Sequence, residues 1–370
     1  MKTKEFDFFL PPNLIAQFPP EKRGQSRLMT LDRNSGLREH KKILDLPGIL
    51  CEERFLSSCG EKPLLVFNDT KVRKARLIGK SAESGANAEF LLLDKTSDNE
   101  TGILNDEFGI KNEEQTEWKT LVQRAGRRKV GSRYIFFDTD GVEIAQAEIT
   151  REEGEFRFLR FDKPIDDEWL DRYGHIPLPP YIKRSDAPSD ADRYQTVYAN
   201  ETGSAAAPTA GLHFTGEILE ALAARGIERA FVTLHVGLGT FQPVRSENIE
   251  DHVMHEERFI ITESNAQLIE NAIAKKQKII AVGTTSMRTL ESAYNNEQLK
   301  RGWQSTSIFI YPGYKFKITD VLFTNFHTPL STLLMLVCAF AGKDFILESY
   351  KEAVKEEYKF FSYGDAMIII

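Results

Sequence analysis

Two hydrophobic patterns divide the chain. Between residues 118 and 161, short apolar runs are separated by glycine and charged turns; they read WKTLV, RYIFF, VEIAQAEI and FRFLRF. EFLLL at 89–93 belongs to the same series. Strands without intervening helices are typical of a small antiparallel sheet or barrel. We therefore predict a separate strand-rich unit over roughly residues 69–155.

From about residue 165 the pattern changes to strand, glycine-bearing loop and amphipathic helix in alternation. AFVTLHV (230–236) and IIAVG (279–283) have the character of buried strands, and 261–276 has helical spacing. Thr215 is placed to cap one helix, and another begins near Ser331. This alternation favours an α/β fold with a largely parallel sheet. LLVF at 64–67 is a further strand-like run, ahead of the strand-rich part.

Composition narrows the class of protein. A hydrophobic content of 41% and a charged content of 28% fit a globular chain. The net charge of -7 argues against a protein that coats nucleic acid by bulk charge. Three cysteines cannot build a disulfide scaffold, so we expect a cytoplasmic protein. The longest apolar run, 333–341, is far shorter than the roughly 20 residues of a membrane span, and no membrane partner is expected.

Four loops rich in Gly, Thr or His follow strands or precede helices. They are APTAGLHF (207–214), HVGLGTFQPV (235–244), VGTTSMRTLES (282–292) and TNFHTPLST (324–332). In α/β sheets, the crevice beyond the carboxyl ends of the strands binds ligands, because N–H groups and helix N-termini are exposed there. Any one glycine loop can simply make a turn. Four of them predict a ligand site at one sheet edge.

Several common sites are excluded or disfavoured. HVGLGTF lacks the third glycine of a dinucleotide motif, since Gln242 stands there and Pro243 blocks the helix. No phosphate-binding P-loop motif occurs. His252 and His255 are three residues apart, but without an HExxH pattern they do not indicate a metal, and we expect none.

Histidines in these loops are candidates for moving a proton near neutral pH. They are His213, His235 and His327, and Asp320, Asp69 and Glu291 are rival carboxylates. The alternative for each histidine is a hydrogen-bonding role. Arg288 is placed to clamp a ligand carboxylate, with a surface salt bridge as the alternative.

Two further groups suggest contact with RNA. Basic residues gather in the strand-rich part, among them Arg73, Arg76, Arg127 and Arg128. They would neutralise phosphates, although such clusters also form solvated faces. Tyr181, Tyr194 and Gln195 could stack on and hydrogen-bond an unpaired base, with core packing as the alternative. The acidic segment 94–117 is predicted to be a surface loop insertion.

Nine motifs in a fixed order carry a resemblance to one family. GHIPLPPYI, RYQTVYA, APTAGLHF, VTLHVGLGTFQPV, IEDHVMH, IAVGTTSMRTLES, TNFH, STLLMLVCAFAG and FFSYGDAM resemble the S-adenosylmethionine:tRNA ribosyltransferase-isomerase family. The opening DFFLPPNLIAQFPPEKR and LLVFNDTKV are similar to it as well. The resemblance therefore runs nearly from end to end.

The resemblance implies a reaction in queuosine formation. The ribosyl part of S-adenosylmethionine would pass to 7-aminomethyl-7-deazaguanine at the wobble position of tRNAs with a GUN anticodon, giving epoxyqueuosine and releasing adenine and methionine. It also implies a discontinuous α/β catalytic domain of residues 1–68 and 156–370, with a β-barrel-like domain inserted at 69–155 that is a possible tRNA contact. S-adenosylmethionine would be a co-substrate, with no cofactor, and we expect a monomer.

On this interpretation the site residues acquire roles. His213 would be the leading base, with His235, His327 and Asp320 as partners. The residues expected to hold the donor are Thr209, Gly211, Gly237, Gly239, Thr240, Thr284, Thr285, Arg288 and Asn325, with Arg288 on its carboxylate. The competing readings are an S-adenosylmethionine-dependent RNA methyltransferase and a non-catalytic RNA-binding protein.

Overall fold

The computed structural model describes residues 1–95, 117–237, 244–295 and 298–370. The predicted acidic loop at 94–117 lies almost wholly outside the described residues. The chain forms two compact units, Met1–Val72 with Leu178–Ile370, and Arg73–Pro177.

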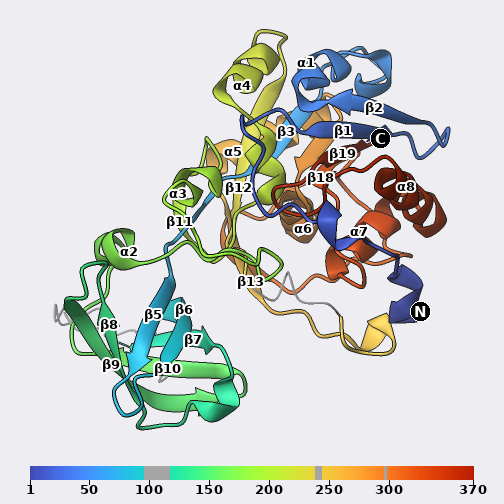
Figure 1. Cartoon of the computed structure of the whole chain (residues 1–370). Coiled ribbons are helices and arrows are strands. Elements are labelled where there is room, and N and C mark those ends of the chain that lie inside the picture. The colour runs from blue at the N-terminus through green and yellow to red at the C-terminus, as the bar shows by residue number, and fades with distance from the viewer. Residues whose placement is uncertain (96–116, 238–243, 296–297) are drawn as a thin grey trace. The chain divides into compact units, whose positions relative to one another are not determined.

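The larger unit is built on a nine-stranded mixed sheet (Figure 1). In spatial order its strands are β17 (Gly302–Thr306), β13 (Glu257–Ile261), β12 (Glu228–Leu234), β3 (Leu64–Asn68), β14 (Ile279–Val282), β18 (Val321–Asn325), β19 (Ala366–Ile369), β1 (Arg27–Leu31) and β2 (Arg38–Lys42). The four strands β12, β3, β14 and β18 are parallel, as are β1 and β19. The other pairs are antiparallel. The α/β prediction is confirmed, with parallel pairing concentrated at the centre.

Alternation along the central strands fills two cores. Leu64 and Val66 of β3 belong to one core, whereas Leu65 and Phe67 belong to the other. The first core is covered by α5 (Glu263–Ala274), α6 (Thr284–Ala293), α7 (Thr332–Ala341) and α8 (Lys343–Lys355). The second is covered by α1 (Leu46–Ile49) and α4 (Gly216–Ala223). Helices on both faces leave the strand ends as the place for a site.

Shorter elements complete this unit. A 3₁₀ helix, η6 (Thr209–His213), precedes α4, and α3 spans Asp190–Arg193. Two small sheets pair β4 (Thr70–Val72) with β11 (Glu201–Ser204), and β15 (Tyr294–Asn295) with β16 (Gln298–Leu299). The predicted cap of α4 is present, since Thr215 Oγ1 accepts from Ile218 N at 3.2 Å. Helix α7 begins next to Ser331 as predicted, and Ser331 Oγ caps it by accepting from Leu334 N at 3.2 Å.

The smaller unit is a closed antiparallel barrel, as expected. Its strands follow the order β10 (Phe156–Phe161), β7 (Glu117–Val122), β6 (Asn87–Lys95), β5 (Arg76–Ser81), β8 (Arg133–Phe137) and β9 (Glu143–Glu153). Helix α2 (Asp167–Tyr173) belongs to the same unit. Buried Trp118, Phe90 and Phe136 lie in its interior.

The domain boundary at 155 needs correction. β10 begins at Phe156 and pairs with both β9 and β7, so it closes the barrel. The compact unit runs on to Pro177. Its first residue is Arg73 rather than residue 69, because β4 pairs with β11 of the larger unit. None of the described helices is long and apolar enough to cross a membrane.

Candidate functional site

Four parallel strands end at the same edge of the sheet, and polar segments follow each of them. Asn68–Thr70 follows β3, His235–Gly237 follows β12, Gly283–Thr285 follows β14, and Asn325–His327 ends β18. Across this edge, β12 and β18 are three strand spacings apart, about 14 Å. That span suits one extended small molecule.

Asn325 joins β18 to η6. Its Oδ1 accepts from Thr209 Oγ1 at 3.3 Å, and its Nδ2 lies 3.1 Å from the Phe361 carbonyl and 3.0 Å from His213 Nε2. A carbonyl oxygen only accepts, so the Asn325 atom that faces it must be the NH₂ group. The same NH₂ donates its second hydrogen to His213 Nε2. All hydrogen-bonding atoms of the Asn325 amide are thus used.

This contact fixes the state of His213. Because Nε2 accepts, the ring proton resides on Nδ1, and a doubly protonated ring would place one N–H against another. Burial, and secondarily the Arg23 guanidinium, lower the pKa of His213 to about 4. At neutral pH His213 is therefore a neutral donor through Nδ1. This geometry does not fit the role of leading base predicted for it.

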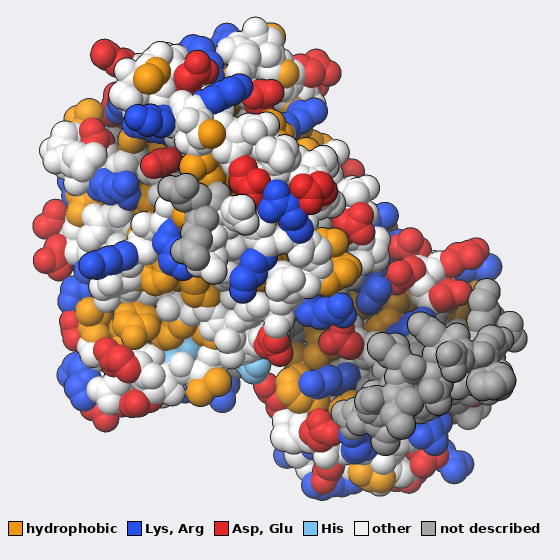
Figure 2. All heavy atoms as spheres, turned by 180° about the vertical axis from the view of Figure 1, so that it is seen from behind, with side chains coloured by type: hydrophobic (Ala, Val, Ile, Leu, Met, Phe, Trp, Pro, Cys, Tyr) orange, Lys and Arg blue, Asp and Glu red, His pale blue; other side chains and the backbone are white. Residues whose placement is uncertain are grey.

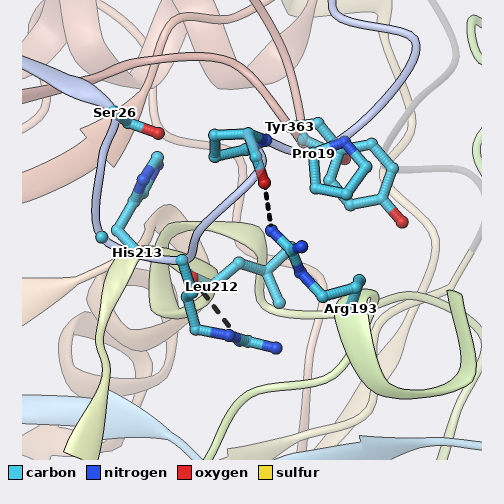
Figure 3. Close-up of a pocket in the computed structure, with 10 residues that line it drawn as sticks. Pro19, Ser26, Arg193, Leu212, His213 and Tyr363 are labelled. Atoms are coloured by element: carbon cyan, nitrogen blue, oxygen red, sulfur yellow. Dashed lines mark hydrogen bonds between the residues drawn. The ribbon is translucent and has the colours of Figure 1, made fainter. Parts of the chain in front are cut away.

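A small cavity lies beside His213 (Figure 3). The His213 ring points toward Ser26, and Arg193 and Tyr363 border the same space. The cavity volume is about 20 Å³, enough for one water molecule and too little for a nucleobase. It gives His213 Nδ1 room for a hydrogen-bonding partner without exposing the ring.

His327 is held in the core rather than in the crevice. Its Nε2 lies 3.0 Å from Thr324 Oγ1, and its backbone N–H donates to the Tyr350 hydroxyl of α8. Burial lowers the pKa of His327 to about 3. The proton-transfer role predicted for it therefore does not fit this environment.

Because His213 and His327 are buried with lowered pKa values, we expect the stability of the protein to depend on pH. Below about pH 6.5 the unfolded chain protonates them, whereas the folded chain does so only near pH 4 and pH 3. The unfolded state thus binds more protons in this window, and the free energy of unfolding falls as the pH decreases. Their joint contribution to the slope approaches about 2.7 kcal/mol per pH unit near pH 5, where the unfolded chain is almost fully protonated at both rings, and it is smaller near neutral pH.

Urea unfolding at pH 7, 6 and 5 measures that slope. His327→Gln should remove about half of the histidine contribution, because it deletes one of the two proton-uptake steps. An unchanged slope in this variant would contradict the burial argument.

His235 and Asp69 lie at the other end of the edge, on β12 and β3. His235 Nδ1 is 2.8 Å from Thr70 Oγ1, and its ring packs against Trp303 with centroids 5.6 Å apart. On the remaining side, a Cβ at Gly203 would come within 2.9 Å of Nε2, so only glycine permits the ring to lie there. Thr233 donates to Asp69 Oδ1 at 2.6 Å, and burial raises the pKa of Asp69.

A buried ion pair joins α6, which follows β14, to β13, the strand beside β12. Arg288 of α6 is 3% exposed and pairs with Glu257 of β13, which also accepts from Gly237 N. Burial lowers the pKa of Arg288 to about 10, so the group stays charged at neutral pH. Arg288 Nε and Nη1 and Thr285 Oγ1 are buried and have no acceptor or donor in the described part of the chain. Unpartnered buried donors of this kind are suited to an anionic ligand.

The other residues predicted to bind the donor molecule differ in their surroundings, and two of them lie outside the described residues. Thr284 opens α6 and is buried. Gly211 must be glycine, because a Cβ there would lie 2.0 Å from the Tyr198 hydroxyl. Gly239 and Thr240 lie outside the described residues.

Asp320 lies at the opposite edge of the sheet, so its predicted place in the site is wrong. Its Oδ2 accepts from Ile279 N at 2.8 Å, at the amino ends of β14 and β18. Five strand residues, about 16 Å, separate it from Asn325. The carboxylate of Glu291 is used for structural hydrogen bonds, since it accepts them from the Tyr314 hydroxyl and from three backbone N–H groups.

The residues expected to recognise a base are largely enclosed. Tyr194 is fully buried, and the Tyr181 hydroxyl lies 2.5 Å from Ser362 Oγ. The Gln195 amide makes two hydrogen bonds, one to Val72 N and one to Val72 O. This arrangement does not fit base stacking by Tyr194 or base reading by Gln195.

The basic residues of the barrel divide into two groups. Arg73 pairs with Asp167 and Arg76 with Glu89, so their charges are neutralised within the barrel unit. Arg127 is exposed, and Arg128 donates to Asn87 O. On the face shown in Figure 2, described cationic and anionic side chains are interspersed rather than separated into broad patches.

Some residues of this edge carry little signal in the sequence. Asn68 holds the end of β12 through both its amide atoms, which bond Leu234 N and O. Its position after LLVF could have identified it. Glu257 and Phe361 could not have been found, because their roles depend on partners 31 and 36 residues away. Among described residues, no three His, Cys, Asp or Glu side chains gather as metal ligands do.

Comparisons with known proteins cover the whole chain. The family model described as queuosine biosynthesis protein matches residues 3–369. A curated relative from Treponema denticola, named S-adenosylmethionine:tRNA ribosyltransferase-isomerase, is 52% identical over 100% of both chains. A relative of that name from Caldanaerobacter subterraneus is 49% identical over 100% of both. The crystal structure of an S-adenosylmethionine tRNA ribosyltransferase from Thermotoga maritima has 35% identity and a TM-score of 0.52, covering 99% of this chain and 100% of that one.

Proposed function

Because the chain belongs to the queuosine biosynthesis protein family, we propose that it transfers and isomerises the ribosyl part of S-adenosylmethionine onto 7-aminomethyl-7-deazaguanine in tRNA. The product is epoxyqueuosine-tRNA, with adenine and methionine released. The observation that supports this proposal is the sequence identity of about half, over the full length of the chain, to relatives named S-adenosylmethionine:tRNA ribosyltransferase-isomerase. The acceptors are wobble bases of tRNAs with a GUN anticodon, and the enzyme acts in the cytoplasm as a monomer.

The chemistry sets three demands on the protein. The sulfonium of the donor acidifies the neighbouring ribose C5′ hydrogens, so a base must remove one of them as adenine leaves. The departing adenine needs a hydrogen-bond donor or acid. The acceptor amine then attacks the unsaturated sugar, and closure of a sugar oxygen displaces methionine, so water must be excluded meanwhile.

We assign these demands to the two ends of the strand edge. His235 is the candidate base, because Thr70 Oγ1 holds its Nδ1 at this end of the strand edge, where the buried Asp69 carboxyl also lies. His213 is the candidate source of a hydrogen bond to the leaving adenine through a bridging water, because the cavity beside it is too small for the base itself. Arg288 and Thr285 are the candidate partners of the donor carboxylate, since their buried polar atoms lack partners in the described chain.

An exposed phenylalanine replaces the buried tyrosines as the candidate stacking surface. Phe18 is 67% exposed, and the Arg184 guanidinium lies 4.5 Å from its ring centroid. Arg184 is itself held by both oxygens of Asp190 and by the Gln17 carbonyl. The ring is thus fixed on one side while remaining open to solvent, as a platform for an unpaired base must be.

Phe18→Ala should weaken binding of an anticodon stem-loop by about 5- to 150-fold, because one base stack contributes roughly 1–3 kcal/mol. Fluorescence anisotropy with a labelled stem-loop measures this. Phe9→Ala is the matched control, since Phe9 is also exposed but carries no guanidinium from the described residues over its ring. Equal affinities of the two variants would remove Phe18 from the proposal.

We also propose that no metal or redox cofactor takes part, because the steps above are a proton transfer, an elimination, an addition and a displacement, and none of them needs an external oxidant or reductant. Turnover on a short anticodon stem-loop should survive EDTA. Loss of turnover that zinc or magnesium restores would overturn this part.

The experiment that tests the function uses two labelled donors. S-adenosylmethionine labelled in the ribose should transfer label to tRNA that carries the aminomethyl base, whereas methyl-labelled donor should not. Methyl label in the RNA would indicate a methyltransferase, and no label would indicate a binding protein.

A further inference from the structure

The loop between β7 and β8 concentrates positive charge. Residues 123–132 contain four cations and no acid in a chain whose net charge is -7: Arg124, Arg127, Arg128 and Lys129. Three of the four are exposed, and only Arg128 is half-buried, where its guanidinium lies over the Tyr134 ring. The loop is thus a cationic projection on a small barrel.

A single buried guanidinium holds this loop from beneath. Arg157 of β10 is 3% exposed. Its Nε donates to the Arg128 carbonyl at 2.7 Å, and its Nη2 donates to the Ala125 carbonyl at 2.7 Å. Its Nη1 donates to the carbonyls of Gly154 and Phe156 at 3.0 and 2.7 Å. Burying a guanidinium is costly unless its donors are paired, and here all three nitrogens are.

The two carbonyls bound within the loop bracket its turn. Ala125–Arg127 forms the 3₁₀ helix η5, and Arg124 ahead of it has a left-handed backbone, with φ of 57°. Such a backbone is uncommon for a residue other than glycine. Hydrogen bonds from Arg157 to both ends of this turn compensate for it and keep the loop in one conformation.

Nearby acids are already occupied. Glu152 lies 3.3 Å from Arg157 Nη2 and 3.8 Å from Lys129 Nζ, and Glu153 pairs with Arg151. Glu148 pairs with Arg133. No ion pair is recorded for Arg124 or Arg127 in the described part of the chain, so their charges are available to an external anion.

We propose that Arg157 is a positioning residue that pre-orders this loop so that Arg124, Arg127 and Lys129 contact phosphates of the tRNA backbone. The proposal rests on the proposed function, which makes tRNA the polyanion that the protein must hold. Ordering a loop residue costs roughly 1–2 kcal/mol, and a loop ordered before binding avoids that cost when RNA arrives.

The first test removes the two unpaired charges. Arg124→Ala/Arg127→Ala should weaken tRNA binding and lower the slope of log affinity against log salt by about 1.4 to 1.8, the value for two lost phosphate contacts. A wild-type salt slope would overturn the proposal. Wild-type protein that releases no adenine would instead overturn the proposed function.

The second test addresses Arg157 itself. Arg157→Lys keeps the charge but loses the forked donors, so it should weaken tRNA binding about 5- to 30-fold, the cost of ordering roughly one residue. Tryptic cleavage after Arg127 should also accelerate. Arg160→Lys, at an exposed position on the same strand, is the matched control and should change neither quantity. Wild-type cleavage and affinity in Arg157→Lys would refute the positioning role. If that variant unfolds the barrel, the double alanine variant still decides whether the loop binds RNA.

Discussion

Arg288→Met should destabilise the protein by about 3–5 kcal/mol and raise the KM for S-adenosylmethionine by about tenfold or more. Both effects follow from burial. Removing Arg288 leaves the Glu257 carboxylate buried without its ion-pair partner, which is among the costliest single changes in a core. A charge-assisted hydrogen bond to the donor carboxylate contributes roughly 1.5–3 kcal/mol, which accounts for the change in KM.

A second variant separates the two effects. Arg288→Met/Glu257→Met removes both charges together, so it should recover much of the stability while the KM stays high. Urea unfolding and initial-rate kinetics on both variants provide the comparison. If the double variant recovers a normal KM, Arg288 is structural and the donor carboxylate binds elsewhere.

His235→Gln should slow adenine release by about 10²- to 10⁴-fold with little change in tRNA affinity, because a positioned base contributes about that factor. Glutamine retains a polar group that can meet Thr70, so the fold of the edge should survive. The readout is a single-turnover assay of adenine formation at saturating donor and tRNA.

The same assay on Asp69→Asn tests the alternative that Asp69, rather than His235, is the base. If His235 is the base, Asp69→Asn should reduce the rate far less than His235→Gln. The reverse order would transfer the role of base to Asp69. His40→Gln is the control, since His40 contacts Tyr358 and Glu352 away from this edge and should leave the rate unchanged.

The sequence predicted local structure well where a pattern is short-ranged. LLVF, AFVTLHV and IIAVG became β3, β12 and β14, and Thr215 caps α4. Side-chain alternation and caps depend on neighbours within a few residues, so the sequence alone carries them. The position of β19 could not be predicted. This last strand pairs with β18 and with β1, partners more than 40 residues away in the chain.

The same distinction between short-range patterns and distant partners applies to the residues of the candidate site. Loops following parallel strands must reach one edge, so the sequence places His235 and Asn325 at the same edge, while their chemical roles stay predictions. The protonation state of His213 could not be predicted. It depends on the Asn325 amide, which the carbonyl of Phe361, 148 positions after His213 in the chain, orients toward His213 Nε2. The burial of Tyr194 could not be predicted, because an aromatic residue beside polar ones fits an RNA-binding surface and a core equally well.

The most direct test of the central claim is a balance of products. Purified protein, S-adenosylmethionine and tRNA carrying 7-aminomethyl-7-deazaguanine are incubated, and free adenine, free methionine and ribosylated tRNA are quantified together. We predict that the three accumulate in equal amounts. Modified tRNA without adenine, or S-adenosylhomocysteine in its place, would contradict the claim that this enzyme transfers the sugar of its donor.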